Sequence, residues 1–299
     1  MSFILLDYAI IAKEKFKLKK AFLMGLLLCV TVTYFSVIKV SVSIVPQKTF
    51  VEAVGKEKVN VMVIIPPGNS PANYAPTARQ IIDFSRSRVY FTIGVPTEAS
   101  NILPKMAKNA PEVHVIHLEK RVDSVYQPRT FARDKRDPHI WLSPKRVIIM
   151  IQSIRDFLSS EDPQNSNYYE ANAQEYIAEL QRIDTDLKKQ FSTIENKGFF
   201  CYHPAFGYFA DDYDLIMHPL EAEGKDATAK RLAELVDLAK KESIKVIFYQ
   251  AEIDSSQTLS FANEIGGKAL KLDPLSAEYI DNLTNMGHIF AEVFQNDDG

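Results

Sequence analysis

The chain has 299 residues, of which 46% are hydrophobic and 24% are charged, with 11 glycines and 15 prolines, as in ordinary globular proteins. This composition argues against a disordered chain, collagen and repeat solenoids. Its 35 Lys and Arg against 38 Asp and Glu give a net charge of -3, so no overall basic field attracts nucleic acid. The 2 cysteines, one of them in an apolar run, argue against a disulfide framework.

The N-terminus has the pattern of an export signal or membrane anchor. Lysines crowd the stretch before residues 21–38, AFLMGLLLCVTVTYFSVI, which carry no charge. As a helix this segment is about 27 Å long, close to the ~30 Å of bilayer hydrocarbon. Positive charge before it keeps that end cytoplasmic and sends the rest outward. We therefore expect an extracytoplasmic protein, in the periplasm or on the outer face of the cytoplasmic membrane, secreted or anchored through residues 21–38.

The fate of this segment stays open at the level of the sequence. No small-x-small cleavage site separates it from the first predicted strand, which favours an uncleaved anchor. Cys29 follows three leucines and resembles a lipoprotein acylation site only loosely, because a small residue normally precedes the acylated cysteine.

The remaining chain alternates short β-rich runs with amphipathic stretches, the pattern of parallel-sheet α/β layers. Residues 39–163 are predicted to form an N-terminal α/β lobe, after the signal or anchor over 1–38. Its predicted strands lie at 39–46, 59–65, 89–94 and 113–118. Its predicted helices lie near 49–55, 76–86, 97–108 and 143–159.

A long helix and a second α/β lobe are predicted to follow. Asn165 to Ile194 contains no Pro or Gly, and its apolar residues recur every three or four positions, so we assign 164–194 to one rigid linking helix. The C-terminal lobe covers 195–299, with strands predicted at 199–203, 245–250 and 268–272. Helices are predicted near 227–242, 255–265 and 276–294. A cleft between the lobes, at the carboxyl ends of the strands, is the expected ligand site.

Three side chains of the types that bind metals stand at strand ends or helix starts. His139 lies in DPHIWLSP between two prolines, with Ser143 placed to cap a helix that starts at Pro144. His203 ends FFCYH, Asp273 ends the strand KALKL, and each precedes a proline. Two imidazoles and a carboxylate from separate loops suit a borderline divalent ion such as Zn²⁺, Mn²⁺ or Fe²⁺.

Together these segments resemble the solute-binding proteins of bacterial zinc and manganese ABC importers, over residues 39 to about 295. The resemblance rests on PPGNSPANYAPT, DPHIWLSP, the long helix, YHPAFGYFA, GKDATAKRLAELVDLAKKE and LDPLSAEYIDNL, in this order. It implies two α/β lobes joined by a backbone helix, with the metal in the cleft. It also implies that His139, His203 and Asp273 are the second, third and fourth metal ligands.

The first ligand of that family has no counterpart here. Members commonly have a histidine after SP in the first of these segments, where this chain has Ala72. Alanine cannot coordinate a metal, so Asn73, Asn69 or a water would have to replace it. The loop Glu119 to Arg136, where zinc importers often have a histidine-rich stretch, contains no histidine. The sequence therefore leaves zinc against manganese or iron open.

Three functions follow from these features. The first is an extracytoplasmic receptor that is not an enzyme, uses no organic cofactor, and delivers a divalent metal to an ABC permease. The second is a metal-free or altered-ligand receptor of the same fold, whose cleft residues would contact another ligand: Tyr74, Gln80, Tyr202 and Tyr208. The third is a metal-dependent hydrolase with Glu252 or Asp254 as general base, which no HExxH or nucleophile motif supports.

Overall fold

The computed structural model describes residues 37–131, 135–221, 224–250 and 256–296, and Val37–Gly299 form one compact unit. Residues 21–36 of the predicted anchor, with Cys29, lie outside the described residues, as do Glu252 and Asp254. In the described ranges, no helix has the length and apolar character needed to cross a bilayer.

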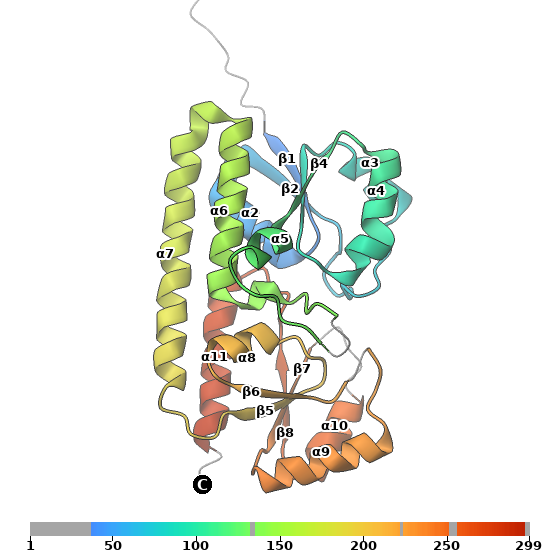
Figure 1. Ribbon diagram of the computed structural model, residues 1–299, viewed down its shortest axis with the longest axis vertical. Helices are drawn as coiled ribbons and strands as arrows, with labels where there is room; N and C mark the ends of the chain where they lie inside the picture. The colour runs from blue at the N-terminus through green and yellow to red at the C-terminus, as the bar shows by residue number, and fades with distance from the viewer. Residues whose placement is uncertain (1–36, 132–134, 222–223, 251–255, 297–299) are drawn as a thin grey trace, which may run out of the picture. The chain divides into compact units, whose positions relative to one another are not determined.

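The described chain forms two lobes, each built on a four-stranded sheet in which all neighbouring strands are parallel (Figure 1). The predicted fold class is confirmed. The sheet of the N-terminal lobe has the order β2-β1-β3-β4, and that of the C-terminal lobe has the order β6-β5-β7-β8. The N-terminal lobe includes β1 (Ile38–Val42), α2 (Val45–Gly55), a 3-10 turn (Lys56–Lys58), β2 (Val59–Val63), α3 (Ala78–Phe84), β3 (Val89–Thr92), a π-helical turn (Glu98–Ile102), α4 (Leu103–Asn109), β4 (His114–His117), α5 (Leu118–Asp123), a 3-10 turn (Ile140–Leu142) and α6 (Pro144–Glu161).

A 3-10 turn (Pro163–Asn165) leads from α6 into the long helix α7 (Ser166–Phe191), which was predicted from its apolar period. The C-terminal lobe includes β5 (Gly198–Cys201), α8 (Gly207–Asp212), β6 (Ile216–Pro219), α9 (Ala229–Lys241), β7 (Val246–Gln250), α10 (Ser256–Glu264), β8 (Lys268–Leu272) and α11 (Tyr279–Asn296).

The central strands are apolar on both faces, because helices cover both sides of a parallel sheet. Val40 and Val42 of β1 and all four residues of β3 are buried. Val40 pairs with Val61 on one side and with Val89 on the other, so β1 lies inside the sheet. At about 25 cal/mol per Å², burial of such side chains is the main stabilising contribution to each lobe.

Helix α7 joins the lobes through packing as well as through the chain. It contacts α2 and α6 of the N-terminal lobe and α11 of the C-terminal lobe, and Figure 1 shows it running along the outer side of both lobes. Its buried stripe includes Leu180, Ile183, Leu187 and Phe191, at the spacing of one helical face. The predicted apolar face is correct, although the helix ends at Phe191 and Ile194 packs just beyond it.

Two predicted boundaries of the first elements were wrong. The strand predicted over 39–46 ends at Val42, and the helix predicted from residue 49 begins at Val45. Pro46 has the backbone angle of a first helical turn, and the Gln47 side chain accepts the N–H groups of Ser43 (2.9 Å) and Ile44 (3.2 Å). These hydrogen bonds begin the helix at Val45, directly after the apolar residues that were predicted to continue the strand.

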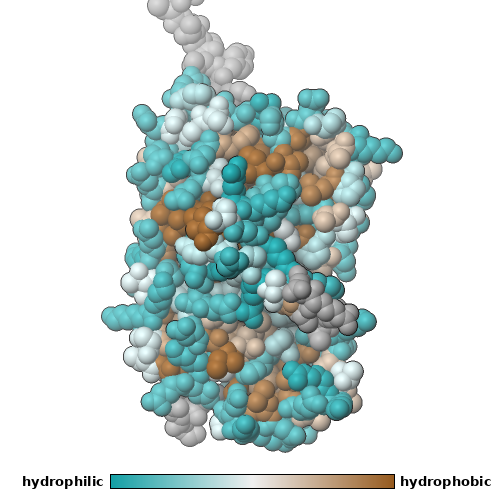
Figure 2. Space-filling view, in the orientation of Figure 1, coloured by the Kyte–Doolittle hydropathy of each residue, from teal (hydrophilic) through white to brown (hydrophobic). Residues whose placement is uncertain are grey.

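Three short elements were not predicted, because they are too short to show a pattern. Helices α5 and α8 have only six residues and β6 only four, too few for a clear period. On the face of the molecule drawn in Figure 2, polar side chains divide the apolar surface into separate patches.

Candidate metal centre

His139 and His203 come from different lobes and meet in the cleft. His139 directly precedes the 3-10 turn before α6, and His203 follows the end of β5. Their Nε2 atoms are 3.3 Å apart, and the centres of their rings are 5.1 Å apart. The structure therefore brings together two of the three predicted ligands.

Each of these histidines has a carboxylate on its other ring nitrogen. Asp137 Oδ1 lies 2.7 Å from His139 Nδ1, and Glu221 Oε2 lies 2.8 Å from His203 Nδ1. An ionised carboxylate only accepts hydrogen bonds, so Nδ1 carries the proton in each neutral imidazole and Nε2 keeps its lone pair. This is the arrangement by which carboxylates orient metal-binding histidines in proteins.

Neither carboxylate was singled out from the sequence. Asp137 is two residues before His139, whose backbone N–H also donates to Asp137 Oδ1 at 2.9 Å. An aspartate side chain commonly accepts the backbone N–H two residues later, so the Asp-Pro-His sequence does contain a signal for this pairing. Glu221 follows β6, whose pairing with β5 continues as the Glu221 N–H donates to the Tyr202 carbonyl at 2.9 Å. Because β6 was not predicted, no pattern in the sequence indicated that Glu221 pairs with His203.

The facing nitrogens are arranged for a cation. His139 is 8% exposed, and burial lowers its pKa below the ordinary 6.5 despite the nearby Asp137 carboxylate, so its neutral form is favoured. Two neutral imidazoles that point lone pairs at each other repel, and a cation bound by both removes that repulsion. Two Zn–N bonds of about 2.0–2.1 Å at a tetrahedral angle place the nitrogens about 3.3–3.4 Å apart, as observed here.

The histidines border a cavity of about 390 Å³ at the carboxyl ends of the strands. Its wall includes Ser70, Pro71, Ala72, Gly94, Val95, Pro96, Phe131, Lys135, Arg136, Pro138, His139, Trp141, His203, Gln250, Pro274 and Leu275. Trp141 joins its two sides, because its indole N–H donates to the Pro274 carbonyl at 2.8 Å. The cleft predicted between the lobes is thus a real cavity.

The other predicted ligands lie at or beyond the edge of this cavity. Asp273 follows β8 as expected, but it is exposed, and its Oδ1 accepts the Leu275 N–H at 2.9 Å. Ala72 is in the cavity wall. Asn69 donates to the carbonyl of Pro66 at 3.3 Å, and neither it nor Asn73 is part of the wall. Among the described residues, no group of three or more His, Cys, Asp or Glu is placed to hold a metal.

Several other side chains predicted near the cleft have structural partners. Tyr74 donates to Gln80 at 2.8 Å, Tyr202 donates to Asp226, and buried Tyr208 donates to the Asp137 carbonyl at 3.1 Å. None of the four residues expected to contact an alternative ligand is in the cavity wall.

A buried ionic cluster links the lobes next to the histidines. Asp212, at the end of α8, accepts hydrogen bonds from Ser143 (2.5 Å) and Arg146 (3.0 Å), and Lys145 Nζ lies 2.5 Å away. Ser143 is the N-cap residue of α6, which begins at Pro144 as predicted, but its hydroxyl donates to Asp212 and makes no side-chain cap hydrogen bond.

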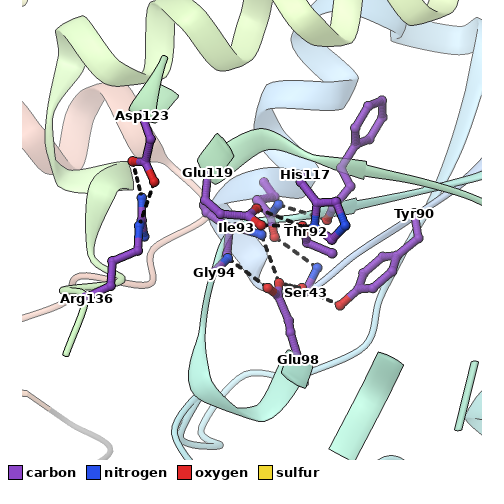
Figure 3. A network of polar contacts seen from close by, with 12 residues as sticks. Ser43, Tyr90, Thr92, Ile93, Gly94, Glu98, His117, Glu119, Asp123 and Arg136 are labelled. Carbon is purple, nitrogen blue, oxygen red and sulfur yellow. Dashed lines mark hydrogen bonds and ion pairs between the residues drawn. The ribbon is translucent and has the colours of Figure 1, made fainter. Parts of the chain in front are cut away.

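A second buried network supports the cavity wall from the N-terminal lobe. The Glu98 carboxylate accepts the backbone N–H groups of Ile93 (2.9 Å) and Gly94 (2.7 Å) and the hydroxyl of Ser43 (Figure 3). Beside it, Thr92 donates to Glu119 at 2.7 Å. Burial is the main reason that the pKa of Glu98 rises from 4.5 to about 7. The carboxylate thus holds the backbone at Gly94, which is part of the cavity wall.

This shift predicts a pH-dependent stability. Because the folded-state pKa of Glu98 is raised, its stabilising contribution is complete below pH 4.5 and is lost as the pH rises through about 7. The free energy of unfolding of the native chain, relative to Glu98→Gln, is expected to fall by about 3 kcal/mol across this window. Denaturant unfolding at both ends of the window measures it. A difference that is the same at both ends would contradict the prediction.

Comparisons with known proteins place the chain in a family. Residues 40–293 match the family model described as the periplasmic component A of a zinc-uptake complex. The chain is 28% identical over 261 residues to the zinc-binding protein AdcA of Streptococcus pyogenes serotype M3, covering 80% of this chain and 50% of AdcA. It thus spans about half the length of that relative.

Two further similarities extend over most of both chains. The high-affinity zinc uptake system protein ZnuA of Bacillus subtilis is 28% identical over 244 residues, which cover 77% of this chain and 76% of that protein. A crystal structure of ZnuA superposes with a TM-score of 0.81 at 32% identity, over 86% of this chain and 98% of the other.

Proposed function

The chain belongs to the family of periplasmic zinc-uptake components, and on this premise we propose that it is the extracytoplasmic receptor of an ABC importer that captures Zn²⁺ between its lobes. The family is one of solute-binding proteins and not of enzymes. The hypothesis of a metal-dependent hydrolase therefore has no support.

The observation that carries the proposal is the 3.3 Å separation of the two Nε2 atoms, each on a ring oriented by a carboxylate. This spacing suits a tetrahedral ion with nitrogen ligands and so favours zinc over manganese, which prefers oxygen ligands. It also argues against a metal-free receptor, which would have no use for two facing lone pairs.

His139 and His203 are the proposed nitrogen ligands, and Asp273 is the proposed carboxylate ligand from the loop beside Trp141. An oxygen ligand would have to replace the missing first ligand at Ala72: that of Asn73 or Asn69, which both lie outside the wall, or that of a water. With two imidazoles and one carboxylate from protein, the site resembles the open zinc sites that keep a position for an exchangeable ligand. An exchangeable ligand suits a receptor that must also release its metal.

Release to a permease is the second part of the proposal. Helix α7 contacts helices of both lobes, so we expect small lobe movements and ligand exchange on docking rather than wide hinge opening. Residues 21–38 would hold the receptor at the outer face of the membrane, near the permease.

The test is calorimetric titration of the full-length chain, in detergent, with Zn²⁺, Mn²⁺ and Fe²⁺, comparing the native chain with Glu221→Gln. We expect stoichiometric binding of Zn²⁺, tighter than that of Mn²⁺. Loss of the Glu221 carboxylate, which orients the His203 ring, should weaken zinc binding by about 10–100-fold.

The matched control is Glu242→Gln, which alters a similar pair: Glu242 lies 3.4 Å from His218, away from the cavity. It should leave the zinc affinity unchanged. Absence of zinc binding by the native chain would refute the proposed function, and equal effects of the two variants would refute the role of Glu221.

A further inference from the structure

The cavity is larger than a single metal ion requires. An ion held by side chains sits about 2.0–2.2 Å from each ligand atom, whereas pockets for small organic molecules have about 300–1,000 Å³. The cavity here has about 390 Å³ and borders both histidines. It thus has room for a small molecule beside the metal.

The charged side chains in the described part of this wall are basic. Lys135 and Arg136 are both in the wall, and no Asp or Glu is among its described residues. Arg136 already pairs with Asp123, at 2.8 Å and 3.1 Å. Lys135 is exposed and makes no ion pair with a described residue. This positive charge repels a bare divalent cation, whereas it attracts an anion.

Backbone pairing of the described neighbours positions Lys135 in the cavity wall. Thr130 and Arg136 form an antiparallel bridge, and the Phe131 N–H donates to the Lys135 carbonyl at 2.6 Å. The Phe131 ring lies 6.5 Å from the His139 ring, measured between centres. Lys135 and the metal ligand His139 therefore border the same space from one short segment.

Gln250 provides an independent indication from the other lobe. It ends β7, it is 7% exposed and it is in the cavity wall. Its side-chain Nε2 is buried and has no hydrogen-bond partner among the described residues. An unpaired buried N–H group costs about 1–3 kcal/mol. Amide N–H groups do not bind metals but donate to oxygen, so a ligand with acceptor oxygens would satisfy Gln250.

From these observations we propose that the cavity captures zinc as an anionic complex with a small polycarboxylate, a proposal that rests on the receptor function above. His139 and His203 bind the metal. A carboxylate oxygen of the small molecule occupies the position left open by Ala72, and its remaining carboxylates face Lys135 and Gln250.

The experiment is equilibrium dialysis of the full-length chain, in detergent, against radiolabelled citrate with and without Zn²⁺, with zinc measured in parallel. We expect stoichiometric retention of citrate only when zinc is present. Lys135→Glu should reduce citrate retention by at least about tenfold, whereas the affinity for zinc alone should not fall, because a carboxylate in place of the ammonium attracts a cation. Lys240→Glu is the control, since Lys240 is an exposed lysine on α9 outside this cavity.

A second variant tests the open position. Ala72→His should raise the affinity for zinc alone and reduce citrate retention, because the new imidazole would take the place of the carboxylate oxygen.

Three outcomes would overturn the inference: zinc is bound but citrate only competes for it, citrate is retained equally without zinc, or Lys135→Glu behaves like Lys240→Glu. All three leave the receptor function intact. Failure to bind zinc either with or without citrate would instead overturn the receptor function itself.

Discussion

Replacing His139 by alanine is expected to weaken zinc binding by at least about 100-fold. Four-ligand zinc sites bind with roughly 10–16 kcal/mol, so one ligand contributes about 3 kcal/mol, which corresponds to a factor of about 100. The 2.7 Å hydrogen bond by which Asp137 orients the imidazole for a metal is lost together with the ring. Calorimetric titration with Zn²⁺ measures the effect.

His203→Ala separates loss of the ligand from loss of the fold, since His203 is only half-buried. It should lose zinc affinity to a similar extent with less effect on unfolding. His218→Ala is the control, because His218 also pairs with a glutamate but lies away from the cavity. Unchanged zinc affinity in both His139→Ala and His203→Ala would remove these residues from the metal site.

Replacing Asp212 by alanine is expected to lower the free energy of unfolding by about 3–5 kcal/mol, because it leaves a buried cation without its partner. The Asp212 side chain is 1% exposed and that of Arg146 is 9% exposed. The guanidinium of Arg146 lies 4.4 Å from the centre of the Tyr208 ring, and this contact does not replace the lost carboxylate. Denaturant unfolding of both chains without metal gives the difference.

The neighbouring residue supplies the control. Asp211 pairs with Arg129, but its side chain is 49% exposed, so Asp211→Ala should cost about 1 kcal/mol or less. If both variants lose the same free energy of unfolding, the buried pairs of Asp212 stabilise the fold no more than the exposed pair of Asp211 does. Since Asp212 joins α8 to the start of α6, its loss should also loosen the contact between the lobes.

Much of the architecture was predictable because it depends on local patterns. The alternation of apolar strands and amphipathic helices identified two α/β lobes, and the three-to-four-residue period over α7 identified the long helix. Six-residue helices and the four-residue strand β6 were not predictable in this way, because packing and not period determines them. The early turn at Pro46 was missed because its signal is one buried hydrogen-bonding side chain, Gln47.

Of the site, sequence alone determined that His139, His203 and Asp273 lie at the ends of strands or the start of a helix, where parallel sheets bind ligands. Only the tertiary structure decided that His139 and His203 meet with Nε2 atoms 3.3 Å apart, that Asp137 and Glu221 orient them, and that Asp273 stays exposed at the edge. The reason is physical: local residue order sets which side chain follows a strand, whereas distances across the cleft depend on how two lobes pack on α7 and around Asp212.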